Sequence, residues 1–305
     1  MRRTWVAFAV ALLSFATAGP APAAIPPSRA TSAPAPQHIV VIVFENKEAD
    51  GILGPGSSAR YFRSLAGASV TLTRFFAIRH PSLPNYLALT SGSTHGVTSD
   101  CTTCLVDDVN LVDQLEGASI SWKAYMESMP EACSTVPVDG TYVMKHDPFM
   151  YYTDIRDDPA RCAKVVPLRQ LTSDLASDSL PTFAWITPNL CHDMHDCSIA
   201  TGDRFLRTWV SRITPALGTN GIIITLFDEG YTSEGCCHGR AAGGHIVGIV
   251  SGPGAGAGVS IRTRVDQYSI LRLIEDAWGL DALGEARRAP LIEGWRALGI
   301  DGVTT

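Results

Sequence analysis

The stretch Ile39-Val40-Val41-Ile42-Val43-Phe44-Glu45-Asn46 joins six consecutive apolar residues to two polar ones. A strand that is apolar at every position is buried on both faces, as strands in parallel sheets are. Similar runs separated by helical patterns lie at residues 70–78, 183–186 and 222–227, the first of them weaker and more amphipathic. The alternation predicts an α/β fold with a largely parallel central sheet flanked by helices.

Polar residues follow all four runs. In chain order they are Glu45-Asn46, His80 with Ser82, residues 189–196, and Asp228-Glu229. Ligands of open α/β sheets bind outside the carboxyl ends of the strands. We therefore expect these four clusters to meet at one rim of the sheet.

The segment His80-Pro81-Ser82-Leu83-Pro84-Asn85-Tyr86 offers a hydroxyl where an apolar run passes into a helix. Ser82 suits the N-cap and Pro84 the first helical turn. Backbone N–H groups and the positive end of the helix dipole would then face an anion beside Ser82. The segment favours a nucleophile that attacks phosphate, and an ordinary helix cap is the alternative.

Glu45, Asp228 and Glu229, with the carbonyl of Asn46, offer hard oxygen ligands for a divalent cation. One or two cations of unspecified identity would lie next to Ser82, acidify its hydroxyl and neutralise a phosphate. The alternative is a solvated acidic pair behind a strand. The joint placement of these residues with Ser82 favours the metal site.

Two further clusters carry histidine. Asp193-Met194-His195-Asp196 lies between Cys191 and Cys197 and suits a ligand or an acid/base group on a loop. In Lys145-His146-Asp147-Pro148-Phe149, Lys145 and His146 could hold phosphate oxygens or protonate a leaving group. A surface loop and a surface turn are the respective alternatives.

The chain's first residues have the charged, apolar and small-residue regions of a secretory signal, which we place at residues 1–24. A Pro/Ala-rich linker at 25–37 and one catalytic domain at 38–305 are expected to follow. No later apolar run is long enough for a membrane span. Removing Arg2 and Arg3 takes the net charge from −6 to −8, which disfavours nucleic acid as a partner. No coiled-coil seam argues for association, so a monomer is expected.

The eight cysteines fit an oxidising compartment. Proximity suggests the pairs Cys101/Cys104, Cys133/Cys162 and Cys191/Cys197, and leaves Cys236 and Cys237. Zinc is the alternative for the first pair, but the adjacent Cys236-Cys237 lacks the spacing of a second half-site. Structural disulfides are therefore the expectation.

Taken together, five ordered motifs resemble the secreted phosphoesterases that include acid phosphatases and phosphatidylcholine-type phospholipases C, a branch of the alkaline phosphatase superfamily. They are Val43–Asn46, His80–Tyr86, Ser121–Glu127, Lys145–Phe149 and Phe227–Glu229. The resemblance implies an alkaline-phosphatase-like sandwich. It also implies that Ser82 forms a phosphoseryl intermediate, with Glu45, Asn46, Asp228 and Glu229 around the metal.

The same resemblance assigns roles to the remaining candidates. Asn85 matches a position that holds a phosphate oxygen, Lys145 and Asp193 are expected to bind substrate, and His146 and His195 are candidates for general acid. Phospholipase C members tend to carry extra C-terminal domains that do not follow here, which favours a phosphomonoesterase acting on a small phosphorylated substrate or a phospholipid head group. A diester-cleaving phospholipase C and a non-catalytic binding protein are the alternatives.

Overall fold

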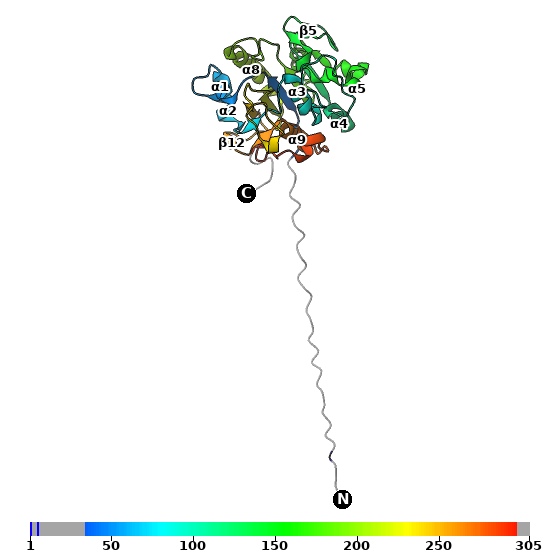
Figure 1. Cartoon of the computed structure of the whole chain (residues 1–305), viewed down its shortest axis with the longest axis vertical. Coiled ribbons are helices and arrows are strands. Elements are labelled where there is room, and N and C mark those ends of the chain that lie inside the picture. The colour runs from blue at the N-terminus through cyan, green and yellow to red at the C-terminus, as the bar shows by residue number, and fades with distance from the viewer. Residues whose placement is uncertain (2–4, 6–33, 298–305) are drawn as a thin grey trace. The chain divides into compact units, whose positions relative to one another are not determined.

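The computed structural model describes residues 34–297 together with Met1 and Trp5 (Figure 1). The predicted signal peptide and most of the predicted linker lie outside the described residues. The main sheet has eight strands in the order β12-β2-β11-β9-β1-β8-β4-β7. Their bounds, in that order, are Val259–Ile261, Val70–Leu72, Gly248–Ser251, Ile222–Phe227, Ile39–Phe44, Phe183–Thr187, Trp122–Met126 and Val165–Pro167.

The pairings in this sheet are parallel except those of β11, which runs antiparallel to both β9 and β2. Two small sheets accompany it. One joins β10 (His245–Ile246), β3 (Phe75–Phe76) and β13 (Val265–Asp266), and the other joins β5 (Val138–Asp139) to β6 (Tyr142–Val143). The predicted α/β fold with a largely parallel sheet is confirmed.

The helices follow the expected alternation with strands. The α-helices α1 to α9 span Ala49–Leu53, Arg60–Ala68, Ser82–Ser91, Leu111–Gly117, Thr153–Arg156, Pro159–Cys162, Arg169–Ala176, Ile199–Ile213 and Gln267–Trp278. Short 3₁₀ turns η1 to η5 span Met144–His146, Pro148–Tyr151, Thr214–Ala216, Cys237–Gly239 and Gly284–Arg288.

Alternation along β1 shows which helices cover which face of the sheet. The Phe44 ring packs against Phe62 of α2 and Phe205 of α8. Trp185 pairs in register with Val41, and therefore points to the opposite face, where it meets Tyr86 of α3. Figure 1 shows α2 and α8 on one side of the sheet and α3 and α9 on the other. The sheet is thus covered by helices on both faces, and every residue of β1 is buried.

Two sequence expectations need correction. Residues 70–78 form two strands in different sheets, because β2 ends at Leu72 and β3 covers only Phe75–Phe76. The predicted linker also ends earlier than residue 37, since Pro36 is buried and its carbonyl accepts a hydrogen bond from the Trp278 indole at 3.1 Å. The chain is therefore already docked on the domain before β1 begins.

The three proposed disulfides Cys101–Cys104, Cys133–Cys162 and Cys191–Cys197 are present, and the adjacent Cys236 and Cys237 form a fourth. All eight cysteines are thereby paired. Among residues 34–297, no helix is long and apolar enough to cross a bilayer.

Candidate active site

The carboxyl ends of β9, β1 and β8 lie side by side because these strands are neighbours in the sheet. The Asp228 N–H donates to the Phe44 carbonyl at 2.8 Å, and the Glu45 N–H donates to the Asp193 carbonyl at 2.9 Å. Glu45 therefore lies between the segments that follow the two flanking strands. The rim predicted from the four polar clusters forms here.

Ser82 is the first residue of α3 and is 1% exposed. Its hydroxyl lies 3.0 Å from Glu45 Oε2 and 3.4 Å from Glu229 Oε1. The expected N-cap position is wrong by one residue, because Pro81 is the N-cap and Ser82 already has helical geometry. The hydroxyl consequently points to the carboxylates instead of capping its own helix.

Asn85 holds the loop that leads to Ser82. Its Oδ1 accepts the N–H groups of Ile78 and Arg79, and its Nδ2 donates to the carbonyls of Arg79 and Pro81. The side chain is fully buried. These four backbone contacts engage the whole amide of Asn85 and position the loop, and its contact with a phosphate oxygen stays a prediction.

Asp228 binds backbone with one oxygen only. Its Oδ1 accepts from the N–H groups of Asn46 and Glu229, at 3.1 and 2.6 Å. Its Oδ2 is buried and has no hydrogen-bond partner among the described residues. An unpaired carboxylate oxygen in the interior is unfavourable unless a cation or a proton occupies it.

Acidic groups outnumber bases in this cluster. Burial raises the pKa of Glu45, and the Asp228 and Asp193 carboxylates raise it further. Burial also raises the pKa values of Asp228, Asp193 and Glu229. The half-buried Lys47, whose Nζ donates to the Asn46 and Met194 carbonyls at 3.1 and 2.8 Å, contributes one positive charge.

This donor set fits a hard divalent cation, because it consists of carboxylate oxygens with the unpaired Asp228 Oδ2 among them. The expected Asn46 carbonyl is less available, since it already accepts from Lys47. Glu229 also has only one oxygen free for a cation, because its Oε2 lies 2.5 Å from His80 Nδ1.

His146 lies beneath this cluster and is 2% exposed. Its Nε2 is 3.3 Å from Glu45 Oε1 and its Nδ1 is 3.4 Å from Asp193 Oδ2, without a hydrogen bond at either nitrogen among the described residues. Its ring stacks on Tyr86 at 5.5 Å. Burial lowers the pKa of His146 well below its ordinary value, with Lys145 and His195 adding to the effect. The neutral ring is thus favoured at neutral pH.

The Cys191–Cys197 loop supplies the second histidine. The His195 N–H donates to Asp193 Oδ1 at 2.7 Å, and the His195 ring is 5.9 Å from that of His146. His195 Nδ1 lies 2.6 Å from Asp196 Oδ1 at the surface. Asp193 is fully buried and fixes the backbone of His195, and its predicted role in substrate binding stays a prediction.

Lys145 reaches the start of α3 through an acidic partner. Its Nζ donates to Asp100 Oδ2 at 2.9 Å, and Asp100 Oδ1 accepts the Leu83 N–H at 3.0 Å. Burial alone would lower the pKa of Lys145, but the hydrogen bond to Asp100 raises it. The positively charged Lys145 ammonium is therefore held, through Asp100, near Leu83, the residue that follows Ser82.

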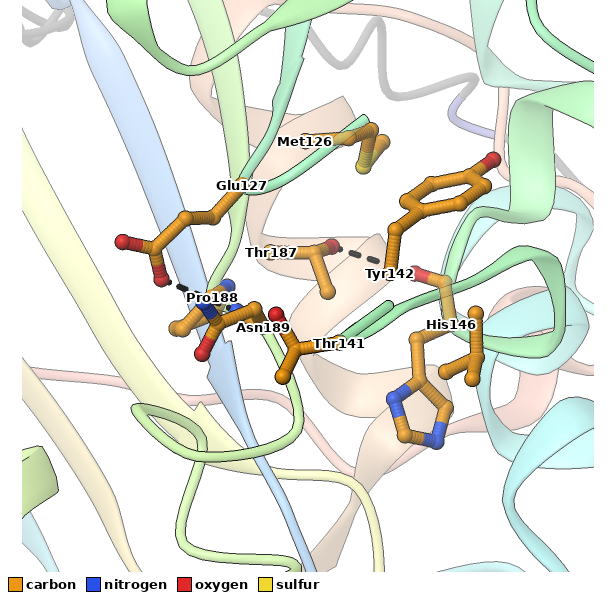
Figure 2. A pocket seen from close by; sticks show the side chains of 9 residues that line it. Met126, Glu127, Thr141, Tyr142, His146, Thr187, Pro188 and Asn189 are labelled. Carbon is orange, nitrogen blue, oxygen red and sulfur yellow. Dashed lines mark hydrogen bonds between the residues drawn. The ribbon is translucent and has the colours of Figure 1, made fainter. Parts of the chain in front are cut away.

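A cavity of about 10 Å³, with room for about one water molecule, adjoins His146 (Figure 2). Glu127 and Asn189 lie on its wall, where the Asn189 N–H donates to Glu127 Oε2 at 3.0 Å. Thr187 Oγ1 donates to the His146 carbonyl at 3.1 Å. The ends of β4 and β8 thus hold the backbone of η1 in place.

Two residues near the cluster had no role assigned from the sequence: Tyr86, which donates its hydroxyl to Glu45 Oε1 at 2.6 Å, and Lys47, which lies among the carboxylates. His80 was expected at the rim, and the structure places it against Glu229. Tyr86 and His80 belong to the quoted heptapeptide, so its helical period could have placed Tyr86 one turn beyond Ser82. Nothing in the sequence distinguishes Lys47 from an exposed lysine.

A profile of the Phosphoesterase family matches residues 56–281. The chain belongs to the phosphoesterase family. It is 32% identical over 267 residues to the phosphatidylinositol-3-phosphatase of Mycobacterium tuberculosis. That match covers 86% of this chain and 84% of that protein. It is 29% identical over 232 residues to an acid phosphatase of Aspergillus fumigatus, covering 72% of this chain and 51% of that protein. The chain thus matches about half the length of this fungal relative.

The fold of this phosphoesterase is shared with a solved protein of the alkaline phosphatase superfamily from Vibrio parahaemolyticus. The TM-score is 0.56 at 14% sequence identity, and the match covers 86% of this chain and 73% of that one. The phosphoesterase is accordingly a hydrolase of phosphoric ester bonds on an alkaline-phosphatase-like fold. Glu45 and Asn46 precede the family match at residue 56, and the sheet brings them to residues within it.

Proposed function

We propose that this phosphoesterase is a secreted, metal-dependent phosphomonoesterase that acts through a phosphoserine at Ser82. The observation that carries the proposal is the Ser82 hydroxyl at the start of α3, within reach of Glu45 and Glu229 and beside the unpaired Asp228 Oδ2. The relatives named as phosphatases support a monoester substrate. A small phosphate ester and a phospholipid head group both fit this class.

Glu45, Asp228 and Glu229 would hold one or two divalent cations, with Asn46 as a further oxygen donor. When bound, such a cation would acidify the Ser82 hydroxyl and neutralise phosphate oxygens. The orphaned oxygen of Asp228 and the excess of buried carboxylates support this assignment. Tyr86 fixes the orientation of Glu45 through its 2.6 Å hydrogen bond.

In the proposed reaction, Ser82 Oγ releases its proton to solvent and attacks phosphorus, while Glu45 and Glu229, the two carboxylates within reach, fix the position of the oxygen. The P–O bond to the leaving group breaks in line, and the leaving oxygen takes a proton from His195, or from His146 at a pH low enough to protonate its buried ring. Water then attacks the phosphoserine, and Ser82 Oγ leaves and regains a proton. Lys145 supplies positive charge toward the substrate from its anchor on Asp100.

The proposed organisation keeps a single catalytic domain from residue 38 onward, exported by the signal at residues 1–24. Four disulfides support an oxidising location. The monomeric state remains a prediction, to be read from sedimentation of the mature chain.

The proposal is tested by hydrolysis of p-nitrophenyl phosphate and of its phosphocholine ester, with and without chelator. The Ser82→Ala variant is compared with Ser91→Ala, a buried serine near the other end of the same helix. We expect chelator-sensitive monoester turnover that is lost in Ser82→Ala and kept in Ser91→Ala. Full activity of Ser82→Ala would overturn the assignment of the nucleophile. Preference for the phosphocholine ester would favour a phospholipase C, and inactivity of the folded, metal-loaded chain on both would favour a binding protein.

A further inference from the structure

A second polar cavity, of about 310 Å³, lies between the strand-like segment before His80, the turn at Cys236–Ala242 and helix α9. Its polar lining consists of Arg79, Thr94, Arg240 and Tyr268. None of these side chains belongs to the cluster around Ser82. All four can donate hydrogen bonds, and neither arginine can accept one.

The donors of this cavity are largely unused within residues 34–297. The Arg79 guanidinium and the hydroxyls of Tyr268 and Thr94 make no hydrogen bond to another described residue. Tyr268 is only 5% exposed, and it lines the cavity with a hydroxyl that has no hydrogen-bond partner among the described residues. The Nε of Arg240 is likewise buried and unpaired.

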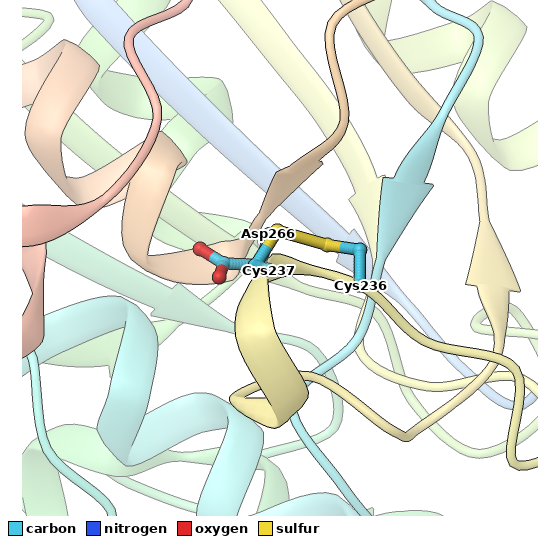
Figure 3. Close-up of side chains that lie close together, drawn as sticks. All are labelled: Cys236, Cys237 and Asp266. Carbon is cyan, nitrogen blue, oxygen red and sulfur yellow. A yellow bond between two sulfur atoms is a disulfide. The ribbon is translucent and has the colours of Figure 1, made fainter.

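Arg240 is held rigidly at the cavity wall. Its two terminal nitrogens donate to Asp266 Oδ2 and to the Arg288 carbonyl, both at 3.1 Å. The residues before it form a left-handed turn, with φ of 62° at Cys237, 59° at His238 and 81° at Gly239. Non-glycine residues rarely adopt this conformation. The disulfide between the adjacent cysteines closes the turn (Figure 3).

Cys236, Cys237 and Asp266 lie close enough together to suggest a metal site, but their chemistry does not support one. Both sulfur atoms are consumed by the disulfide. The Asp266 oxygens accept from Arg240 and from the Ser269 N–H at the start of α9. We therefore interpret this cluster as the support that presents Arg240 to the cavity.

The opposing charges are few. Asp266 neutralises part of Arg240, and Glu285 of η5 is a second negative charge that acts on Tyr268. The Arg79 guanidinium, the hydroxyls of Thr94 and Tyr268 and the unpaired Arg240 Nε remain available in one space. Guanidinium groups bind phosphate-like oxyanions in bidentate fashion, which is the arrangement that such donors favour.

We propose that this cavity is a second anion site, which binds a phosphate group at Arg79, Arg240 and Tyr268. The phosphate is either free orthophosphate or a second phosphate on the substrate. Arg79 is tied to Ser82 because Asn85 holds both the Arg79 backbone and the Pro81 carbonyl. An anion bound to Arg79 would therefore contact the same loop that positions the proposed nucleophile, Ser82.

The binding test is calorimetric titration of the full mature chain with inorganic phosphate. Because the active site also binds its product, the stoichiometry is the readout: we expect two sites in the unsubstituted chain. Arg79→Gln should lose one of them or weaken it roughly tenfold or more, and the conservative Tyr268→Phe should weaken it several-fold. Arg156→Gln, a half-buried arginine of α5 outside the cavity, is the matched control. A single site that Arg79→Gln leaves unchanged would overturn the proposal, as would equal weakening by Arg156→Gln.

Kinetics then distinguish the two sources of phosphate, and this arm rests on the proposed function. If the second phosphate of the substrate occupies the cavity, fructose 1,6-bisphosphate should have a lower KM than fructose 1-phosphate, and Arg79→Gln should abolish the difference. If free phosphate occupies it, Arg79→Gln should instead remove the part of phosphate inhibition that is not competitive. An inactive enzyme that still binds phosphate at a site removed by Arg79→Gln would refute the proposed function and leave the anion site standing.

Discussion

His80 Nδ1 lies 2.5 Å from Glu229 Oε2, while His80 Nε2 lies 2.8 Å from the Thr232 carbonyl. A carbonyl oxygen only accepts, so Nε2 carries a proton and Nδ1 shares the Glu229 contact. The other oxygen of Glu229 is the one that faces Ser82 at 3.4 Å. His80 therefore fixes the rotamer of a carboxylate that contacts the proposed nucleophile, Ser82.

We expect His80→Ala to lower kcat on p-nitrophenyl phosphate by about 10- to 100-fold, because Glu229 loses the partner that orients it. The melting temperature should change little, since the His80 side chain is 38% exposed. His238→Ala, at an exposed histidine of the same loop region, is the control. If the two variants have equal kcat, His80 has no positioning role.

Asp228→Asn tests the cation site. The variant keeps the shape of the side chain and an oxygen for the Asn46 and Glu229 N–H groups, but it removes the charge behind the unpaired Oδ2. Metal content after dialysis, measured by atomic emission, should fall at least about tenfold. Asp139→Asn, at an exposed aspartate of β5, should retain its metal. Full occupancy in Asp228→Asn would show that Asp228 is not a ligand.

His146→Gln and His195→Gln decide which histidine protonates the leaving group. Nitrophenolate leaves without a proton, whereas an alkoxide requires one. Loss of the general acid should therefore lower kcat on an alkyl phosphate by about 10²- to 10⁴-fold and that on p-nitrophenyl phosphate far less. We expect the larger selective loss at His195, whose side chain is partly exposed, because His146 is buried. Equal losses on both substrates would point to a structural role for the substituted histidine.

The sequence predicted the strands whose whole length is buried and the polar residues directly behind them. β1 and β9 have the expected bounds because burial on both faces leaves an unbroken apolar run. The division at residues 73–74 was not predictable, since apolar residues look alike whichever sheet they join. The contact of Tyr86 with Glu45 joins residues 41 positions apart, and only the folded sheet brings them together. The motif placed Asn85 at the site, but the backbone groups that occupy its amide come from loop geometry that the sequence does not show.

Glu275 of α9 makes stability depend on pH away from the candidate active site. The residue is fully buried, its Oε1 accepts the Leu283 N–H at 2.7 Å, and its Oε2 has no partner among residues 34–297. Burial raises the pKa of Glu275 from 4.5 to about 7. Below pH 4.5 both the folded and the unfolded chain hold this proton, so the group costs nothing. Between pH 4.5 and 7 the unfolded chain releases the proton first, and the free energy of unfolding falls.

Glu275→Gln should remove this pH dependence, because the amide keeps an acceptor for Leu283 and cannot ionise. We expect the variant to be roughly 3 kcal/mol more stable than the unsubstituted chain at pH 8, with no such advantage at pH 4. Urea unfolding at both pH values measures the difference, with the exposed Asp276→Asn as the control. Parallel stability curves for the two chains from pH 4 to 8 would mean that folding does not raise the pKa of Glu275.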